Sequence, residues 1–277
     1  MRYVGRQFTV EDVELIRDLI SEGLNRTGIS RTFCEKTDWR KPDGGLKEMS
    51  CRVALLKMHR DGHIILPAPE RPANNHLKKG KRTSLPDAGL IEYARALSLE
   101  ITDKATSALW NELIDRYHYL GFTPLPGAQL RYFVRSNDQI LAALSFSAAA
   151  WKCAPRDDAI GWDSEKRKEN LHLVVNNSRF LILPWVRSKN LASRILSLAA
   201  RRIASDWKER YRYEPVLLET FVEKERFAGT CYKASNWICV GETKGRGKLD
   251  CRHERRLPIK SVWLYPLQKD AARWLKG

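Results

Sequence analysis

One strand-to-helix junction constrains the fold of this chain more than any other segment. Residues 179–184 (RFLILP) predict a strand, and residues 187–211 have the apolar period of a long helix. The turn between them is small and basic, so the first N–H groups of the helix lack partners and the positive end of the helix dipole lies behind them. Such a turn suits an anion, often a phosphate.

Composition is typical of a soluble globular protein. The chain has 277 residues, of which 43% are hydrophobic, enough for a core in one large domain or two smaller ones. It has no run of 18 uncharged apolar residues, and its N-terminal sequence resembles neither a signal peptide nor a transit peptide. We therefore expect a cytoplasmic protein with no membrane contact. The six cysteines show no C-x-x-C spacing, which favours reduced thiols.

The charge balance predicts the class of partner. Forty-nine Lys and Arg against thirty-three Asp and Glu give a formal net charge of +16. A field of this sign attracts polyanions, and the binding weakens as salt is added. No basic amphipathic helix or lipidation signal favours a membrane surface. Nucleic acid, and DNA in particular, is therefore the expected partner.

Residues 1–66 predict a winged helix-turn-helix domain. Three helical stretches, the first capped by Thr9, precede HIILP (63–67), which is expected to be a brief strand. The apolar positions at helical spacing are Val13, Ile16, Leu19 and Ile20 in the first helix and Leu46, Met49, Val53 and Leu56 in the third. Residues 67–89 are rich in Pro, Asn, Lys and Gly and predict a basic linker.

In a winged helix the third helix enters the major groove and offers cations to phosphates and base edges. Ser30 and Arg31 open the second helix, and Arg31 adds a cation to those of the third helix. The residues expected to contact nucleic acid here are Arg31, Lys47, Arg52, Lys57 and Arg60. The alternative is a small helical domain whose basic residues only face solvent.

Residues 90–277 predict a second domain of mixed α and β structure. We expect a hairpin with a turn at residues 136–138 and a long polar loop over residues 152–170. The remaining expected elements are helices in 105–121, 187–211 and 225–236, and strands in 171–184, 214–222, 237–242 and 259–267. The fold class is therefore α/β (α+β).

This order of elements resembles the GCN5-related N-acetyltransferase (GNAT) fold, and two local stretches carry the resemblance. In FLILPWVRSKNLASRIL, Arg187, Asn190 and Ala192 fall on the family's R-x-x-G-x-G/A turn. CYKASNW falls on its Leu-Tyr-x-x-x-Gly-Phe stretch. The resemblance implies that backbone N–H groups of residues 188–192, Ser188 included, hold the pyrophosphate of an acyl-coenzyme A beside Arg187. It also implies that Tyr232 donates a proton to the departing thiolate.

The sequence departs from this pattern at both stretches. Asn190 replaces the central glycine of the turn, and Asn236 replaces the glycine before the aromatic residue. Asparagine tolerates a positive φ, but its side chain occupies space beside the turn. The alternative to phosphate binding is structural capping of the helix by Ser188 or Asn190. The cofactor therefore stays open, with acyl-coenzyme A as the candidate.

Over nearly its whole length the chain resembles the family of protein A of the Druantia anti-phage system, which is also found with transposases. The stretches that carry this resemblance are SRTFCEKTDWRKPDGGLKEMSCRVALLKMH, RYHYLGFTPLPGAQLRYFV, FSAAAWKCAPRDDAIGW, NNSRFLILPWVRSKNLASRIL, LLETFVEKERFAGTCYKASNW and GETKGRG. The resemblance implies a bacterial protein of defence islands and mobile elements, concerned with DNA and with other defence proteins as possible partners. It supplies no reaction. RYHYLGF is also weakly similar to the Mom family of phage DNA-modification proteins.

Four further side chains are candidates for chemistry in this domain. His118 is expected to act as a general base or to contact a base, against the alternative of a half-buried helix cap. Trp162 and Asp163 lie in the polar loop, where the ring is expected to stack on a base and the carboxylate to read an amino group. Glu219 is a candidate general base, against the alternative of an ion pair with Arg179 or Arg187.

Polar residues also interrupt an apolar strand. Asn176, Asn177 and Arg179 are expected to line a site, because buried amides need partners. Asp157, Asp158 and Asp163 are candidates to gather a metal with Glu219 for cleavage. The basic loop 243–256 is expected to contact phosphates through Lys244, Arg246, Lys248, Arg252, Arg255 and Arg256.

The sequence supports three functions and leaves open whether the chain is an enzyme. The leading hypothesis is a DNA-binding component of a defence or mobile-element system, with both domains on one DNA molecule. The second is an acyl-coenzyme A-dependent transferase acting on a nucleobase or protein amine, with Tyr232 as acid and Glu219 as base. The third is a metal-dependent nuclease.

Overall fold

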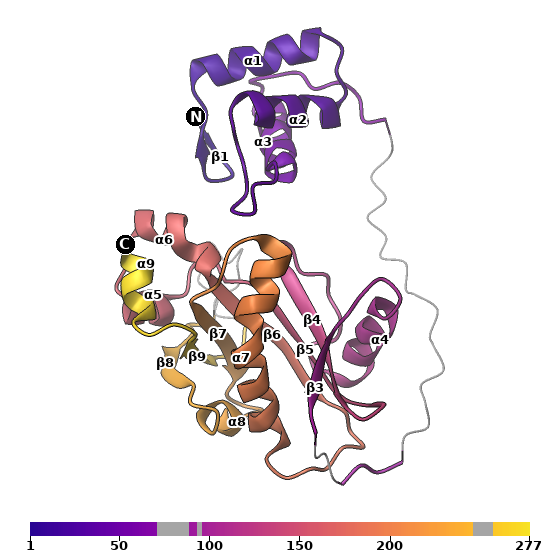
Figure 1. Ribbon diagram of the computed structural model, residues 1–277. Helices are drawn as coiled ribbons and strands as arrows, with labels where there is room; N and C mark the ends of the chain where they lie inside the picture. The colour runs from indigo at the N-terminus through magenta and orange to yellow at the C-terminus, as the bar shows by residue number, and fades with distance from the viewer. Residues whose placement is uncertain (71–88, 93–95, 246–256) are drawn as a thin grey trace. The chain divides into compact units, whose positions relative to one another are not determined.

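The structure is a computed structural model that describes residues 1–70, 89–92, 96–245 and 257–277. Contacts divide the chain into two units, Met1–Lys79 and Gly80–Gly277. The first unit is drawn in indigo and violet in Figure 1, and the second in the remaining colours. Most of the predicted linker (67–89) and all but the first residues of the basic loop (243–256) lie outside the described residues.

The first unit contains three helices after a short hairpin. The hairpin strands are β1 (Arg2–Tyr3) and β2 (Arg6–Gln7), and the helices are α1 (Val10–Ser21), α2 (Arg26–Lys36) and α3 (Glu48–Arg60). Thr9 caps α1 in a capping box: its side chain accepts from the Asp12 N–H, and the Asp12 side chain accepts from the Thr9 N–H. The predicted helices and the Thr9 cap are therefore confirmed.

Two expectations for this unit were wrong. HIILP is not a strand; Ile64 and Leu66 are buried in the core without ladder partners among the described residues. Helix α3 buries Cys51, Ala54, Leu55 and Met58, whereas Met49 and Val53 are 64% and 44% exposed. The third helix has apolar residues on two faces, so spacing alone selected the wrong one. A winged helix is thus not confirmed.

The second unit is built on a seven-stranded mixed sheet, which confirms the α/β class. The strands follow the order β3-β4-β5-β6-β7-β9-β8, and all neighbours are antiparallel except β6 and β7. The strands are β3 (Ser98–Ile101), β4 (Gln129–Ser136), β5 (Gln139–Ala148), β6 (Val174–Ile182), β7 (Leu217–Glu223), β8 (Ile238–Glu242) and β9 (Lys260–Pro266). The predicted hairpin turns at Asn137, whose φ is 52°.

Helices cover both faces of this sheet. Helix α7 (Leu191–Tyr211) runs across one face (Figure 1), where its Asp206 accepts a hydrogen bond from Tyr132 of β4 at 3.0 Å. The neighbouring Arg131 points to the other face, where its guanidinium lies over Trp110 of α4 (Ser107–Tyr117). The short helix α8 (Thr230–Lys233) follows β7.

The polar loop expected at residues 152–170 is instead two short helices. They are α5 (Ala154–Ile160) and α6 (Ser164–Asn170), and a 3-10 turn (Leu171–Leu173) leads from α6 into β6. Ile160 and Trp162 pack with Leu275 of α9 (Ala271–Lys276) in a second apolar cluster. Strand β3 and helix α9 were not predicted, because they are too short to show a period. No helix in the part of the chain that the structure describes has the length and hydropathy of a membrane-spanning segment.

The parallel pair at the centre of the sheet opens along its length. β6 and β7 pair only where Val174–Asn176 face Leu217–Glu219. Beyond this point β6 stays with β5 and β7 stays with β9, so the two central strands have no ladder between them. A β-bulge between β5 and β6, at Ser178, shifts the register at the same place.

Candidate functional site

A pocket of about 580 Å³ occupies the gap where β6 and β7 separate. Its lining comes from both strands, from the C-terminal end of α4 and from the segment that leads into α8. The residues used below are Tyr117, His118, Tyr119, Asn177, Arg179, Thr220, Arg226, Phe227 and Tyr232. His118 and Tyr232 are thus brought together as predicted site residues. Asn177 and Arg179, flagged as polar interruptions of a strand, line the same pocket.

Buried hydrogen bonds fix the floor of the pocket. The Tyr232 hydroxyl donates to Asn177 Oδ1 at 2.8 Å, and Thr220 Oγ1 donates to the Asn177 carbonyl at 3.0 Å. Asn177 Nδ2 donates in turn to the Ser145 carbonyl at 3.0 Å, across the bulge. Burial raises the pKa of Tyr232 well above its usual range. Tyr232 is therefore a neutral donor held toward Asn177. Sequence reasoning missed Thr220, because nothing in a strand's composition shows where its neighbour will separate.

Aromatic rings gather at the mouth of the pocket. The His118 and Tyr119 rings are stacked with centroids 4.9 Å apart, and Phe227 lies 5.4 Å from Tyr119. Tyr119 and Phe227 remain 37% and 49% exposed. The Arg226 guanidinium lies 5.2 Å from the Tyr119 ring centre and pairs with Glu223 at 2.9 Å. The Tyr119 and Phe227 rings, inclined at 59° to one another, therefore present exposed aromatic surface beside the opening.

The tautomer of His118 follows from its contacts. The Leu120 N–H donates to His118 Nδ1 at 3.2 Å, so Nδ1 carries the lone pair and Nε2 carries the proton in the neutral ring. Burial first, and then the charge of Arg179, lowers the pKa of His118 to about 4. At neutral pH the ring is therefore uncharged and offers an N–H. This arrangement favours hydrogen-bond donation by His118.

Arg179 is a half-buried cation in this pocket. Its guanidinium donates to the Ser178 carbonyl at 2.7 Å, and no carboxylate of the described residues pairs with it. Burial lowers the pKa of Arg179, which measures the cost of holding the charge there. An acceptor-rich ligand would remove that cost.

Glu219 is not part of this pocket. Its side chain is fully buried on the opposite face from Thr220 and pairs with Arg156 of α5 at 2.8 Å, while the Ala150 N–H donates to its other oxygen at 2.8 Å. Burial raises the pKa of Glu219, and Arg156 opposes that rise. The predicted ion pair of Glu219 with Arg179 or Arg187 was wrong. Tyr232, the expected acid, and Glu219, the expected base, lie on opposite faces of the sheet.

The two candidates on the expected polar loop have structural roles. Trp162 is 9% exposed and donates to Asp157 Oδ1 at 3.1 Å, so the expectation that its ring stacks on a base was wrong. Asp163 caps α6 by accepting from the N–H groups of Glu165 and Lys166, both at 2.8 Å. Asp157 pairs with Arg156 and Arg167. Within the described residues, no three His, Cys, Asp or Glu side chains gather as metal ligands.

The turn before α7 keeps several amides free. The Arg187 N–H donates to the Ile91 carbonyl at 2.8 Å, but the N–H groups of residues 188–190, 192 and 193 donate to no acceptor in the described chain. Asn190 has φ 57°, the left-handed conformation that the family's glycine adopts with ease, and its side chain does not cap the helix. The free amides beside Arg187 fit an anion such as a pyrophosphate.

The predicted nucleic-acid contacts of the first unit divide into two groups. Arg31 pairs with Glu48 at 3.1 Å, Lys47 is the N-cap residue of α3, and Arg52 is partly buried. Lys57 and Arg60 are exposed and have no side-chain partner among the described residues. In the basic loop, Lys244 is exposed, whereas Arg246, Lys248, Arg252, Arg255 and Arg256 lie outside the described residues.

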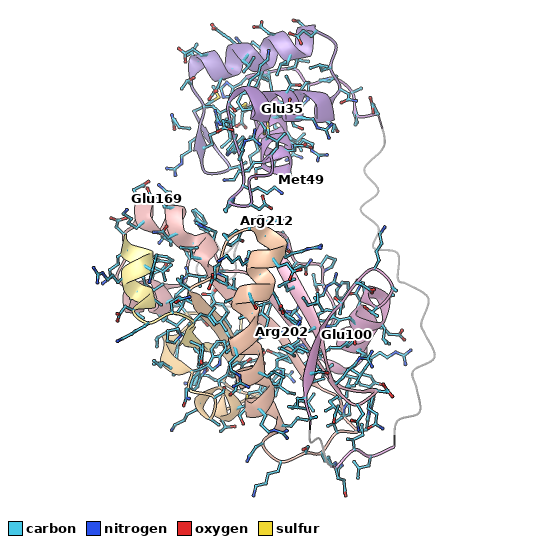
Figure 2. All side chains as sticks on the ribbon, viewed as in Figure 1. Glu35, Met49, Glu100, Glu169, Arg202 and Arg212 are labelled. Carbon is cyan, nitrogen blue, oxygen red and sulfur yellow. The ribbon has the colours of Figure 1, made fainter. Side chains whose placement is uncertain are left out.

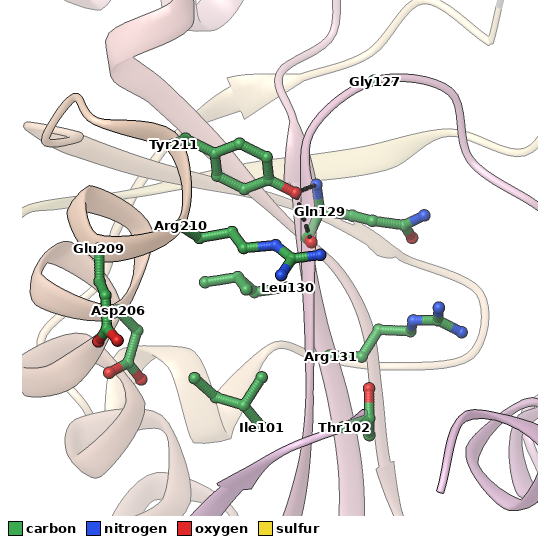
Figure 3. Close-up of a pocket in the computed structure, with 10 residues that line it drawn as sticks. All are labelled: Ile101, Thr102, Gly127, Gln129, Leu130, Arg131, Asp206, Glu209, Arg210 and Tyr211. Atoms are coloured by element: carbon green, nitrogen blue, oxygen red, sulfur yellow. Dashed lines mark hydrogen bonds between the residues drawn. The ribbon is translucent and has the colours of Figure 1, made fainter. Parts of the chain in front are cut away.

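A second pocket, of about 550 Å³, lies between β4 and the end of α7 (Figure 3). Tyr211 closes one side of it, because its hydroxyl donates to the Gln129 carbonyl and accepts from the Gln129 N–H, both at 2.8 Å. Of the two carboxylates that line this pocket, Asp206 and Glu209, the first is bound to Tyr132 and Arg202. None of the predicted site residues lines this pocket.

Comparison with solved structures identifies acetyltransferases of similar chain path. A probable acetyltransferase from Staphylococcus epidermidis is 9% identical, with 62% of this chain and 100% of that chain covered at a TM-score of 0.41. YncA, a putative acetyltransferase from Salmonella typhimurium, is 12% identical, with 64% and 97% covered at a TM-score of 0.40. The ribosomal-protein-S18-alanine N-acetyltransferase from Escherichia coli is 6% identical, with 63% and 96% covered at a TM-score of 0.39.

Among curated proteins no sequence matches the chain. The sequence profile of one protein family does match, over residues 72–255 and thus over more than half of the chain. The matched range contains the pocket between β6 and β7 and the turn before α7, and it begins after the three helices of the first unit. The chain therefore belongs to the family described as Druantia protein DruA.

Proposed function

We propose that this protein is a DNA-binding component of a bacterial anti-phage defence system, acting in the cytoplasm and together with other defence proteins. The family supports the defence role. The observation that carries DNA binding is the exposed face of α3, on which Met49, Val53, Lys57 and Arg60 follow one another at helical spacing (Met49 is labelled in Figure 2).

The composition of this face suits a major groove. Lys57 and Arg60 are free to contact phosphates or base edges, and the apolar Met49 and Val53 can contact thymine methyl groups. A solvated helix face has no need of two exposed apolar side chains. The exposed apolar residues Met49 and Val53 are thus the best support for a binding helix.

The two units contribute charge unequally. Residues 1–66 contain twelve Lys and Arg against ten Asp and Glu, whereas residues 90–277 contain thirty-two against twenty-one. The first unit therefore supplies little of the field that attracts a polyanion. We infer that its α3 reads the groove while the second unit and the loop 243–256 hold phosphates.

Salt-dependent binding of the full-length protein to duplex DNA tests this function. Each phosphate contact adds about 0.9 to the slope of log affinity against log salt. Lys57→Ala and Arg60→Ala should each weaken binding and make the slope shallower by about one contact. Lys36→Ala, an equal charge change on α2, is the matched control and should have a smaller effect. A flat salt response of the wild type would exclude this function.

A second candidate is an acyl-coenzyme A-dependent transferase, which the free amides before α7 favour. These amides lie in the turn that follows β6. The acyl end of the coenzyme would then bind in the gap between β6 and β7. The coenzyme would supply the acyl group, and Tyr232 would donate the proton to the thiolate. Acetyl-coenzyme A should then raise the melting temperature by mass action. Asn190→Trp, which crowds the turn, should reduce that shift. No shift at millimolar coenzyme would remove this candidate.

A further inference from the structure

The pocket between β6 and β7 holds a cation without a counter-ion. Three other buried or half-buried guanidinium groups of this unit have carboxylate partners: Arg156 pairs with Glu219, Arg167 with Asp157 and Arg202 with Asp206. Arg131 has none, but it donates to Asn111 Oδ1 at 2.6 Å and lies over the Trp110 ring. Arg179 has only the Ser178 carbonyl, although burial disfavours its charge. A carbonyl acceptor alone leaves the charge of this half-buried cation uncompensated, so the pocket is suited to an anionic ligand.

A second donor faces the same ligand. His118 lines the pocket and lies close enough to Arg179 to be affected by its charge. Its Nδ1 is occupied by the Leu120 N–H, so Nε2–H remains available. A guanidinium and an imidazole N–H together suit the oxygens of a phosphate, which accepts several hydrogen bonds at once.

The mouth of the pocket adds exposed aromatic surface next to these donors. Tyr119 and Phe227 are exposed there, and Leu120 is exposed beside them. Exposed rings beside a cationic pocket are the usual platform for nucleobases, because every base has a π face. The volume of about 580 Å³ is within the range of small-ligand sites.

We propose that this pocket binds a nucleoside monophosphate unit, with its base on the exposed Phe227 ring beside Tyr119 and its phosphate on Arg179 and His118 Nε2–H. The unit can be a free nucleotide or one nucleotide of a DNA strand. In DNA it must be unpaired or rotated out of the duplex, since a stacked base cannot enter a pocket. Binding of a nucleotide within DNA rests on the proposed DNA binding, whereas binding of a free nucleotide does not.

Two binding measurements on the full-length protein distinguish these sources. One compares a paired duplex with the same duplex carrying a single unpaired adenine, by fluorescence anisotropy. The other titrates deoxyadenosine monophosphate by calorimetry. A nucleotide from DNA predicts tighter binding of the duplex with the unpaired base, and a free nucleotide predicts heat with the monophosphate.

Variants decide whether the pocket is responsible. Arg179→Gln should weaken the favoured ligand about ten-fold or more, because it removes a charge-assisted hydrogen bond to phosphate. Phe227→Ala should weaken it about five-fold or more through lost stacking. Paired-duplex affinity should change far less in both. Arg131→Gln, which removes a half-buried guanidinium that lies over Trp110, outside this pocket, is the matched control, and melting curves establish that each variant is folded.

Three outcomes would overturn the inference. The first is equal affinity for the two duplexes together with no binding of the monophosphate; salt-dependent duplex binding would then leave the proposed function intact. The second is an equal loss in Arg179→Gln and Arg131→Gln, which would indicate a general charge effect. The third is unchanged binding in both pocket variants. If no oligonucleotide binds, the proposed function fails and the monophosphate titration alone decides the pocket.

Discussion

At the scale of residues, Arg156 and Glu219 form the most deeply buried ion pair in the part of the second unit that the structure describes. Both side chains have 0% exposure, and Asp157 extends the cluster. Desolvation alone would lower the pKa of Arg156, but Glu219 and Asp157 raise it, so the guanidinium stays charged. The cluster anchors α5 to β7 directly behind the pocket. A buried pair of this kind is costly to break from one side.

Replacing one partner of this pair should therefore destabilise the protein more than replacing both. We expect Arg156→Met to lower the free energy of unfolding by about 3–5 kcal/mol, because it leaves the Glu219 carboxylate buried without its cation. Arg156→Met combined with Glu219→Leu should lower it less. Urea unfolding followed by tryptophan fluorescence measures both. Additive losses in the double variant would contradict the pairing.

His118 predicts a pH dependence of stability. Its pKa is about 4 in the folded protein and about 6.5 in the unfolded chain, so the unfolded chain binds the proton first as pH falls. Stability should thus decrease from about pH 6.5 to about pH 4. His118→Asn, which has no proton to bind, should lose less over this window.

Melting temperatures of both proteins at pH 7 and pH 4.5 measure this difference. Other groups that titrate in the window affect the two proteins alike, so the comparison isolates the ring. Equal losses in wild type and variant would show that the His118 pKa is not lowered by folding.

At the scale of elements, the conformation of the turn before α7 explains how Asn190 can replace the central glycine of the R-x-x-G-x-G/A pattern. Asn190 has φ 57°, which asparagine tolerates better than other residues with a Cβ. We expect Asn190→Gly to change the free energy of unfolding by less than about 0.5 kcal/mol, and Asn190→Val to lower it by about 1–2 kcal/mol. Urea unfolding of both variants checks this, and equal costs would contradict the strained turn.

An element could be predicted from the sequence where its pattern of apolar residues is compatible with only one structure. The strand predicted within 171–184 and the helix predicted within 187–211 were confirmed as β6 (Val174–Ile182) and α7 (Leu191–Tyr211), because the apolar residues of each segment fit one type of element. The ranges differ only at their ends: 171–173 form a 3-10 turn, 183–184 follow the strand and 187–190 precede the helix. Helix α3 has apolar side chains on two faces, and only packing shows that Met58 is buried and Met49 is not. Residues 152–170 are polar enough to suggest a loop, yet α5 is held by the buried Arg156 pair.

The candidate site was predictable in its residues and not in its geometry. The polar interruption of an apolar strand at Asn177 and Arg179 indicated a site, and both line the pocket. The gap itself arises where two strands stop pairing, which is a long-range property with no local pattern. Glu219 and Thr220 are adjacent in sequence, and the sheet turns only Thr220 toward Tyr232.

At the scale of the whole molecule, the proposed function requires two units on one DNA. The first unit has a nearly balanced charge and so binds weakly by itself, while the second carries most of the excess. Linking two weak contacts makes the second one intramolecular, with an effective concentration in the millimolar range for a short flexible linker. Residues 67–89, rich in Pro, Asn, Lys and Gly, are the segment that the sequence predicts as the linker between the two units.

Cutting the connection should therefore lower affinity without removing any contact. We expect a variant with a specific protease site placed in residues 72–88 to bind a long duplex as the wild type does before cleavage, and at least ten-fold more weakly after it. Melting curves before and after cleavage show whether the two pieces remain folded. The same protease treatment of the wild type is the control. Unchanged affinity after complete cleavage would mean that a single unit holds the DNA, and the proposed division between a groove-reading helix and a phosphate-holding unit would be wrong.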